Sequence, residues 1–227
     1  MKDCTIIKNY RPITVLNTDY RLYTSILCAR LLRVLGPVVR AHQLAFLPGR
    51  LIDDNIRLVQ ALIDTYKEGA ENYHILFLDQ VKAYDRVFHE YLWACMQGLG
   101  MPRDFIRGIK MLTSEAEIVL NINGHISDRL IMHCDVRQGD PMSCPIYLIA
   151  IEPLLNCFGA CPSISGVGVP RGGAVKAGTF ADDMFMPYKN MPEIHQIQEV
   201  LRSYERASGS KVNWDKSVSM QVGQGTV

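Results

Sequence analysis

The sequence lacks the cysteine patterns of secreted or zinc-knuckle proteins. Its seven cysteines are an odd number, and no two of them form a Cys-x-x-Cys pair. A framework of disulfides needs paired cysteines, and a zinc knuckle needs ligands at short spacing. We therefore expect reduced thiols and an intracellular protein, located in the nucleus, the cytoplasm or both.

Long apolar segments are also absent. The longest uninterrupted apolar run covers eight residues, 144–151, whereas a membrane-spanning helix needs about 20. The first ten residues contain no apolar stretch like that of a secretory signal. The sequence therefore predicts neither a signal peptide nor contact with a membrane.

Charge of one sign is not in excess, because the net charge of the 227 residues is +1. The distribution is uneven: residues 1–50 carry +6, residues 51–100 carry −4 and residues 101–227 carry −1. A basic segment can contact a polyanion, and an acidic segment can gather cations. A solvated basic helix face would give the same asymmetry, so charge alone leaves both interpretations open.

The periodicity of apolar residues predicts a mixture of helices and antiparallel strands. Helical spacing predicts one apolar side of a helix that ends at Gly36-Pro37, made by Leu22, Ile26, Ala29, Leu31 or Leu32, and Leu35. Short apolar runs and the Asn123-Gly124 turn predict strands and hairpins. The predicted helices are 20–35, 54–68, 89–100, 102–113, 143–158 and 192–208, and the strands are 73–79, 117–133 as a hairpin, 175–180, 184–188, 210–214 and 217–222. This pattern predicts an α+β fold.

Three aspartates lie at the ends of apolar strands, where burying a charged carboxylate destabilises the fold. Asp79 ends an apolar strand, and Asp182 and Asp183 lie between two apolar strands about a hundred residues later. Partly buried carboxylates are destabilising unless a cation or a proton compensates them. Carboxylate oxygens suit Mg²⁺, and two such ions can promote phosphoryl transfer. A polar hairpin turn and a strand-ending cap explain the same residues without any metal.

The three aspartates belong to two of six sequence blocks that follow one another along the chain. FLDQVKAYD (77–85) carries an acid followed by Ala83 and Tyr84, and FADD (180–183) is an aromatic-x-Asp-Asp tip. The remaining blocks are NYRPITVLN (9–17), AFLPGRLIDDNI (45–56), RQGDPMS (137–143) and GSKVNWDKS (209–217). Together they cover nearly the whole chain, which resembles the reverse transcriptase of non-LTR (LINE-type) retrotransposons. RQGDPMS and the PGRLIDDNI segment favour that group over the retroviral enzymes.

The resemblance implies a two-metal polymerase. Asp79, Asp182 and Asp183 would hold two Mg²⁺ ions, for which Mn²⁺ can substitute, and the backbone carbonyl of Gln80 would be a further ligand. The implied reaction is attack of a primer 3′-hydroxyl on the α-phosphate of a dNTP, with release of pyrophosphate. The implied partners are an RNA template and a DNA primer or nicked target DNA, as in target-primed retrotransposition.

The resemblance also implies a nucleotide pocket. Tyr84 matches a steric gate that leaves no space for a 2′-hydroxyl, although an ordinary core aromatic is the alternative. Lys82 and Ala83 could offer backbone N–H groups to the triphosphate. Gln138 and Gly139 match pocket-lining residues, with the glycine allowing close backbone approach. A turn before the following helix would also explain that glycine.

Basic residues are assigned roles by the same resemblance. Arg50 matches a triphosphate clamp, because a guanidinium binds phosphate bidentately, but a surface arginine beside Asp53 or Asp54 is the alternative. Candidate template or primer contacts are Lys8, Arg11 and Arg21, and candidate proton donors to pyrophosphate are Lys211 and Lys216. A solvated lysine near a turn also explains each of the last two.

Some positions depart from the family pattern. Leu51 stands where a small hydroxyl residue is usual, and Gln80-Val81 replaces a commoner aromatic-acidic pair. Asp135 stands where a glycine often precedes the RQG block, so the turn is strained if it requires a positive φ. None of these changes removes a candidate metal ligand. They leave open a decayed copy with reduced activity.

We predict a palm-and-fingers fragment with an antiparallel palm sheet packed on helices. Residues 1–70 are the basic, fingers-like part, and residues 71–227 are the palm, with the 117–133 hairpin in or near the fingers. The thumb and endonuclease modules of the family are expected to be absent from this chain.

Three other functions compete with the polymerase. A catalytically weak or silent scaffold that binds RNA would usually have lost an acid, and an RNA-dependent RNA polymerase would usually read Gly-Asp-Asp at the tip. A cyclic-dinucleotide cyclase would carry a Gly-Gly-acid hairpin. In this chain all three acids are present, and the tip reads FADD, which is neither Gly-Asp-Asp nor Gly-Gly-acid. The sequence therefore favours reverse transcriptase over each of the three.

Overall fold

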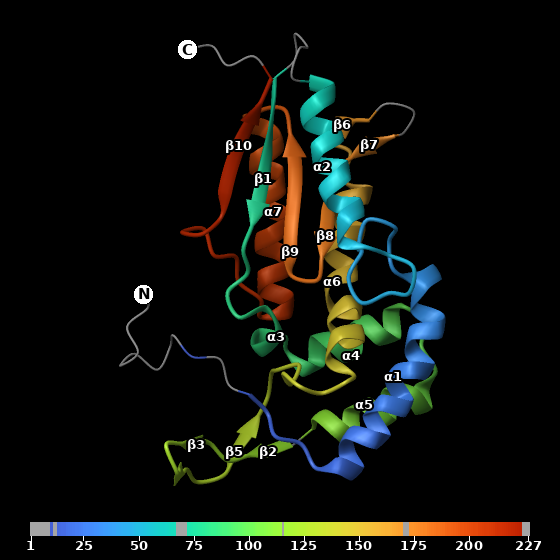
Figure 1. Ribbon diagram of the computed structural model, residues 1–227, viewed down its shortest axis with the longest axis vertical. Coiled ribbons are helices and arrows are strands. Elements are labelled where there is room, and N and C mark those ends of the chain that lie inside the picture. Colours follow the sequence, from blue (N-terminus) through green and yellow to red (C-terminus); the bar gives the residue numbers. More distant parts are fainter. Residues whose placement is uncertain (1–9, 11–12, 67–71, 115, 170–172, 224–227) are drawn as a thin grey trace.

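The computed structural model describes residues 10, 13–66, 72–114, 116–169 and 173–223. Its centre is a four-stranded sheet in the order β10-β1-β9-β8, and every neighbouring pair is antiparallel (Figure 1). The strands are β1 (Tyr73–Leu78), β8 (Gly178–Phe180), β9 (Asp183–Tyr188) and β10 (Val218–Val222). The predicted α+β fold with an antiparallel sheet is confirmed.

Helix α7 (Met191–Ser208) covers one face of this sheet, and Figure 1 shows it running behind the strands. Alternation along β1 sends Leu76 and Leu78 into a core shared with α6 (Ser143–Ala160) and α7 (Met191–Ser208). Tyr73 and Ile75 point to the opposite face, where they pack against α2 (Ile52–Tyr66) and the small β6–β7 ribbon. The ribbon pairs β6 (Val167–Gly168) with β7 (Ala174–Val175).

The remaining elements lie below the sheet in Figure 1. They are α1 (Thr18–Val38), α3 (Ala83–Arg86), α4 (His89–Gly98), α5 (Arg103–Thr113), β2 (Ala116–Ile118), β3 (Asn121–Ile122), β4 (His125–Ile126) and β5 (Leu130–Met132). The predicted hairpin is confirmed: β2 pairs with β5 and β3 with β4, and both Asn123 and Gly124 have positive φ.

The first helix is present, and the predicted face is buried only in its C-terminal half. Leu22 and Ile26 are 63% and 47% exposed, whereas Leu31 and Leu35 are buried. The buried stripe instead runs through Thr24, because the helix rests on α6 along that side. The helix also continues through Pro37 to Val38, past the predicted end at Gly36-Pro37.

The second helix starts two residues before the predicted position. Asp53 and Asp54 therefore lie in its first turn, where acidic side chains favour the helix dipole, and neither is the cap. On this helix Ile56 is 61% exposed, while Leu62 is fully buried. The last predicted residues, 67 and 68, lie outside the described part of the chain.

The predicted strand 210–214 is wrong. Only Val212 makes a bridge, to Gln80, and the chain then turns before β10. The turn forms because the Asn213 carbonyl accepts the N–H groups of both Lys216 and Ser217, at 3.1 and 2.9 Å. This turn proves central to the candidate site.

Helix α6 corrects the expectation about membrane-length segments. Glu152 is its single charged residue, so by length and composition the helix could cross a bilayer. It is nonetheless a core helix, because about two thirds of its residues are buried in the fold. Burial raises the pKa of Glu152, whose carboxylate accepts the Arg40 backbone N–H.

Candidate active site

The sheet brings the three aspartates to one end. Leu78 of β1 pairs with Met184 of β9, so continuing the register sets Asp79 opposite Asp183. Directly opposite residues of antiparallel strands have Cβ atoms about 4.5–5.5 Å apart. Asp182 immediately precedes Asp183 in the tight turn between β8 and β9. Two segments about a hundred residues apart in the chain therefore meet.

Side chains of two glutamines hold this end together. The buried Gln80 donates from Nε2 to the Asp182 carbonyl oxygen at 3.4 Å. Gln43, which is completely buried, accepts the Ala181 N–H at 3.0 Å and donates to the Ala181 carbonyl at 3.3 Å. Ala181 has φ +57, an unfavourable value for alanine, so the two bonds from Gln43 stabilise a strained turn.

Sequence reasoning missed Gln43. The sequence offered one indication of a role for Gln43, which is its position shortly before the 45–56 block. No local pattern indicated that its side chain would be buried. Its neighbours pair with β8, because the Leu44 N–H donates to the Thr179 carbonyl and the Thr179 N–H donates to the His42 carbonyl. The segment before that block thus forms part of the frame around the aspartates.

Asp79 is held by the turn that follows Val212. Asn213 donates from Nδ2 to Asp79 Oδ2 at 2.9 Å, and its backbone N–H donates to the Asp79 carbonyl at 2.8 Å. The Asp79 N–H donates to Ser217 Oγ at 3.2 Å. Lys216 Nζ lies 3.7 Å from Asp79 Oδ2, as an exposed ion pair. The carboxylate is therefore oriented by one amide and one ammonium group.

The donor set fits Mg²⁺ or Mn²⁺ in its chemistry. Asp79, Asp182 and Asp183 are hard oxygen donors, all partly or fully exposed at one sheet end. Within the described residues, no three His, Cys, Asp or Glu side chains are clustered closely enough to form a finished metal site.

Tyr84 lies beside these aspartates. Burial raises the pKa of its hydroxyl, and Cys144, Asp182 and Asp183 raise that pKa further. Its ring stacks on Tyr147 of α6 with centroids 4.4 Å apart. The side chain is half-buried, as a ring that walls one side of a pocket would be.

The RQG loop is tied to the Tyr84 segment. The Val136 N–H donates to the Tyr84 carbonyl at 2.8 Å, and Gln138 Nε2 donates to Asp85 Oδ1 at 3.2 Å. Gly139 has φ +100, and a Cβ there would approach the Thr14 carbonyl oxygen to 3.3 Å. The glycine is therefore required both by its backbone angle and by close contact with the N-terminal segment.

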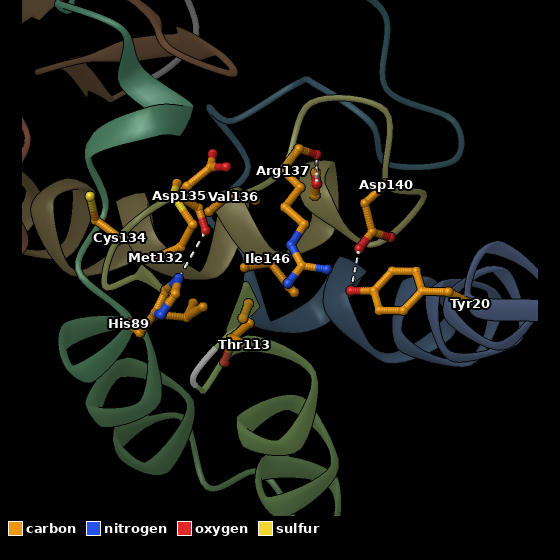
Figure 2. A pocket seen from close by; sticks show the side chains of 13 residues that line it. Tyr20, His89, Thr113, Met132, Cys134, Asp135, Val136, Arg137, Asp140 and Ile146 are labelled. Carbon is orange, nitrogen blue, oxygen red and sulfur yellow. Dashed lines mark hydrogen bonds between the residues drawn. The ribbon is translucent and has the colours of Figure 1, made fainter. Parts of the chain in front are cut away.

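A small cavity opens behind this loop, with volume about 30 Å³ (Figure 2). His89 contacts the Asp135 carbonyl through Nε2 at 3.1 Å, and the Tyr20 hydroxyl donates to Asp140 Oδ2 at 3.0 Å. The Arg137 guanidinium lies over the Tyr20 ring. Asp135 has φ +112, and its buried Oδ1 has no hydrogen-bond partner among the described residues. The strain expected from replacing a glycine is therefore present.

Arg50 occupies a different environment from the aspartates. Its guanidinium donates to four backbone carbonyls at 2.6–3.1 Å, and thereby caps the C-terminal end of α1. The four acceptors are the carbonyls of Gly36, Val39, Arg40 and Gln43. This arrangement is structural, and the triphosphate role of Arg50 stays a prediction.

Of the other basic residues with predicted roles, one lies beside Asp79 and the rest lie elsewhere or outside the described residues. Lys216 lies at the aspartates, whereas Lys211 contributes its backbone carbonyl to the Val81 N–H and has an exposed side chain. Lys82 is exposed, with φ +47, directly before the buried Ala83 of α3. Arg21 is exposed on α1. Lys8 and Arg11 lie outside the described residues.

Comparison with known families establishes the family of this chain. The family model for reverse transcriptase (RNA-dependent DNA polymerase) matches residues 2–225. The chain belongs to the reverse transcriptase family. Membership of this family explains why the six sequence blocks occur in this order.

Relatives of this reverse transcriptase domain come from retrotransposons, as its resemblance to the non-LTR group led us to expect. It is 32% identical to the Transposon TX1 uncharacterized 149 kDa protein of Xenopus laevis, over 97% of this chain and 17% of that protein. It is 27% identical to a Pol polyprotein from the type-1 retrotransposable element R2 of Popillia japonica, over 94% of this chain and 30% of that protein. The domain thus spans less than a third of either relative.

Solved structures agree on the fold. Apo telomerase from Candida tropicalis superposes with a TM-score of 0.62 at 12% identity, over 88% of this chain and 36% of that one. A version truncated from its C-terminal domain gives a TM-score of 0.59 at 14% identity, over 92% of this chain and 42% of that one. At such low identity the likeness concerns the fold alone.

Proposed function

We propose that this domain synthesises DNA on an RNA template by adding dNTPs to a primer 3′-hydroxyl. The observation that carries the proposal is the meeting of Asp79 with Asp182 and Asp183 at one sheet end. Asp79, Asp182, Asp183 and the Gln80 carbonyl would hold two divalent cations, which would activate the attacking hydroxyl and stabilise the departing pyrophosphate. The primer would be a DNA end, including nicked target DNA.

The domain's own residues supply selection and orientation. The Tyr84 hydroxyl is within range of the charges of Asp182 and Asp183, and its ring stacks on Tyr147. From there the ring would exclude a nucleotide that carries a 2′-hydroxyl. Gln138 and Gly139 lie on the loop bonded to that tyrosine segment, and they would wall the base and sugar. The backbone N–H groups of Lys82 and Ala83 would face the triphosphate.

Two basic residues have roles in the proposal as well. Lys216 is close enough to Asp79 to reach the departing pyrophosphate and to donate a proton to it. Arg21 would contact the template or primer backbone from α1, where its side chain is exposed. Both roles depend on charge, so each should weaken as salt concentration rises.

Primer extension on poly(rA)-oligo(dT) with Mg²⁺ tests the proposal. We expect incorporation of dTTP, and a loss of about 100-fold or more in Asp182→Asn, because an amide is a much poorer cation ligand than a carboxylate. Asp128→Asn is the matched control, since Asp128 is exposed in the hairpin region away from the aspartates. Equal extension by Asp182→Asn and the control would refute the proposed chemistry.

A further inference from the structure

Asn213 contacts Asp79, and the proposed function assigns Asn213 no role. Asn213 touches Asp79 twice, through its backbone N–H at 2.8 Å and through its side-chain amide at 2.9 Å. The second bond goes to Oδ2 of the carboxylate. Asn213 is half-buried, so its amide exchanges less readily with water than an exposed side chain would.

The backbone that carries the Asn213 side chain is itself held in place. The Asn213 carbonyl accepts three hydrogen bonds, from the backbone N–H groups of Lys216 and Ser217 and from Ser217 Oγ at 2.8 Å. Val212, the preceding residue, is buried and bridges to Gln80, the residue after Asp79. The backbone on both sides of the amide is therefore fixed relative to β1 before any ligand arrives.

We infer that Asn213 is the positioning residue for the cation at Asp79: its amide occupies Oδ2 and so presents Oδ1 to the metal. The inference rests on the proposed function and adds a residue to it. A carboxylate can rotate about its terminal bond, and one hydrogen bond to a single oxygen removes that freedom. Groups that orient a metal ligand in this way tune affinity without touching the metal.

Lys216 cannot perform this role alone. Its ammonium is 59% exposed and 3.7 Å from Oδ2, so the ion pair is solvent-screened and weakly directional. Its positive charge also opposes a second cation at the same carboxylate. Asn213 orients the oxygen without adding charge, which leaves the full negative charge of Asp79 for the metal.

The test measures Mn²⁺ binding directly, by the loss of the free Mn²⁺ signal in electron paramagnetic resonance. We expect Asn213→Ala to raise the dissociation constant for Mn²⁺ about 10- to 100-fold, the usual cost of losing a group that orients a metal ligand. Asn213→Gln retains an amide donor and should recover part of the loss. Asp215→Ala is the control, because Asp215 is exposed in the same turn.

Coupling to Asp79 distinguishes positioning from general support of the turn. In an Asp79→Ala background, a further Asn213→Ala change should leave the residual Mn²⁺ affinity unchanged, because there is no carboxylate left to orient. Thermal melting without metal should match between Asn213→Ala and the control, since the backbone bond to the Asp79 carbonyl remains. If Asn213→Ala does not fold, Asn213→Gln must show an intermediate affinity.

The possible failures are separable. If the unmodified chain binds Mn²⁺ no better than Asp79→Ala does, the metal site of the proposed function fails. If the unmodified chain binds Mn²⁺ through Asp79 but Asn213→Ala binds it equally well, only the positioning role fails. An equal loss in the Asp79→Ala background would also overturn the inference, because the effect would not pass through Asp79.

Discussion

Asp135 offers a sharp test of backbone and charge energetics in this reverse transcriptase domain. It has φ +112, a region that non-glycine residues rarely adopt, and a buried Oδ1 without a partner among the described residues. Burial raises the pKa of its carboxyl from 3.8 to about 7, with Asp85 raising it further and Arg137 opposing. His89 contacts its carbonyl oxygen rather than its carboxyl.

The sign of the pH effect follows from the raised pKa. The folded chain binds the Asp135 proton more tightly than the unfolded chain, so folding is penalised as the pH rises. The penalty is nearly absent below about pH 4 and complete above about pH 7, where it reaches about 4 kcal/mol as an upper limit. Asp135→Asn removes the ionisation, so it should stabilise the fold by up to about 1.5 kcal/mol at pH 5 and by up to about 4 kcal/mol at pH 8.

Asp135→Gly removes the ionisation and the backbone strain together. A residue in a sparsely populated region costs about 1–3 kcal/mol, of which the greater flexibility of unfolded glycine returns up to about 1 kcal/mol. The glycine variant should therefore exceed the asparagine variant in stability by about 1–2 kcal/mol at every pH.

Urea unfolding followed by circular dichroism at pH 5, 6, 7 and 8 measures both the ionisation penalty and the backbone strain of Asp135, provided that the m value is unchanged. The neighbouring titratable groups, Asp85, His89, His133 and Cys134, are common to all three proteins and provide the baseline. Parallel stability curves for the unmodified chain and Asp135→Asn would refute the raised pKa. Equal stability of the asparagine and glycine variants would refute the strain.

Two further predictions concern a glycine and the nucleotide gate. Gly209→Ala should destabilise by about 2 kcal/mol or more in thermal melting, because φ is +78 and the new Cβ would lie 2.7 Å from the Arg86 carbonyl oxygen. Gly100→Ala, with φ +73 but open space, should lose only about 1 kcal/mol, and equal losses would contradict the clash. Tyr84→Val should raise UTP incorporation relative to dTTP by about tenfold in primer extension, while dTTP is still used. Unchanged sugar selectivity would make Tyr84 a packing residue.

Strong local signals allowed much of the fold to be predicted. The apolar run 73–79, the Asn123-Gly124 turn and the tip between 175–180 and 184–188 each specify a structure by themselves, and all three appear as expected. The β1–β9 register places Asp79 and the Asp182-Asp183 tip at the same end of the sheet, and their joint role as metal ligands stays a prediction. Local pattern suffices where one face of a strand is buried.

The rest depended on tertiary contacts. The α1 sequence contains more apolar residues than one face can bury, so periodicity alone could not show that Leu31 is buried while Leu22 and Ile26 are exposed. The 210–214 segment alternates like a strand, but the side-chain and backbone bonds of Asn213 favour a turn. Gln43 gave no signal, because its partner, Ala181, is 138 residues away.

Backbone hydrogen bonds join the Asp135 turn to the segment that carries Tyr84, the residue that we propose as the nucleotide gate. The Asp135 N–H donates to the Val87 carbonyl at 3.2 Å, and the Val136 N–H donates to the Tyr84 carbonyl at 2.8 Å. Tyr84 is also fixed independently by its stack on Tyr147. Asp135→Gly should therefore raise stability without changing the ratio of dTTP to UTP incorporation. A changed ratio would mean that the strained turn, rather than the aromatic stack, sets the position of the gate.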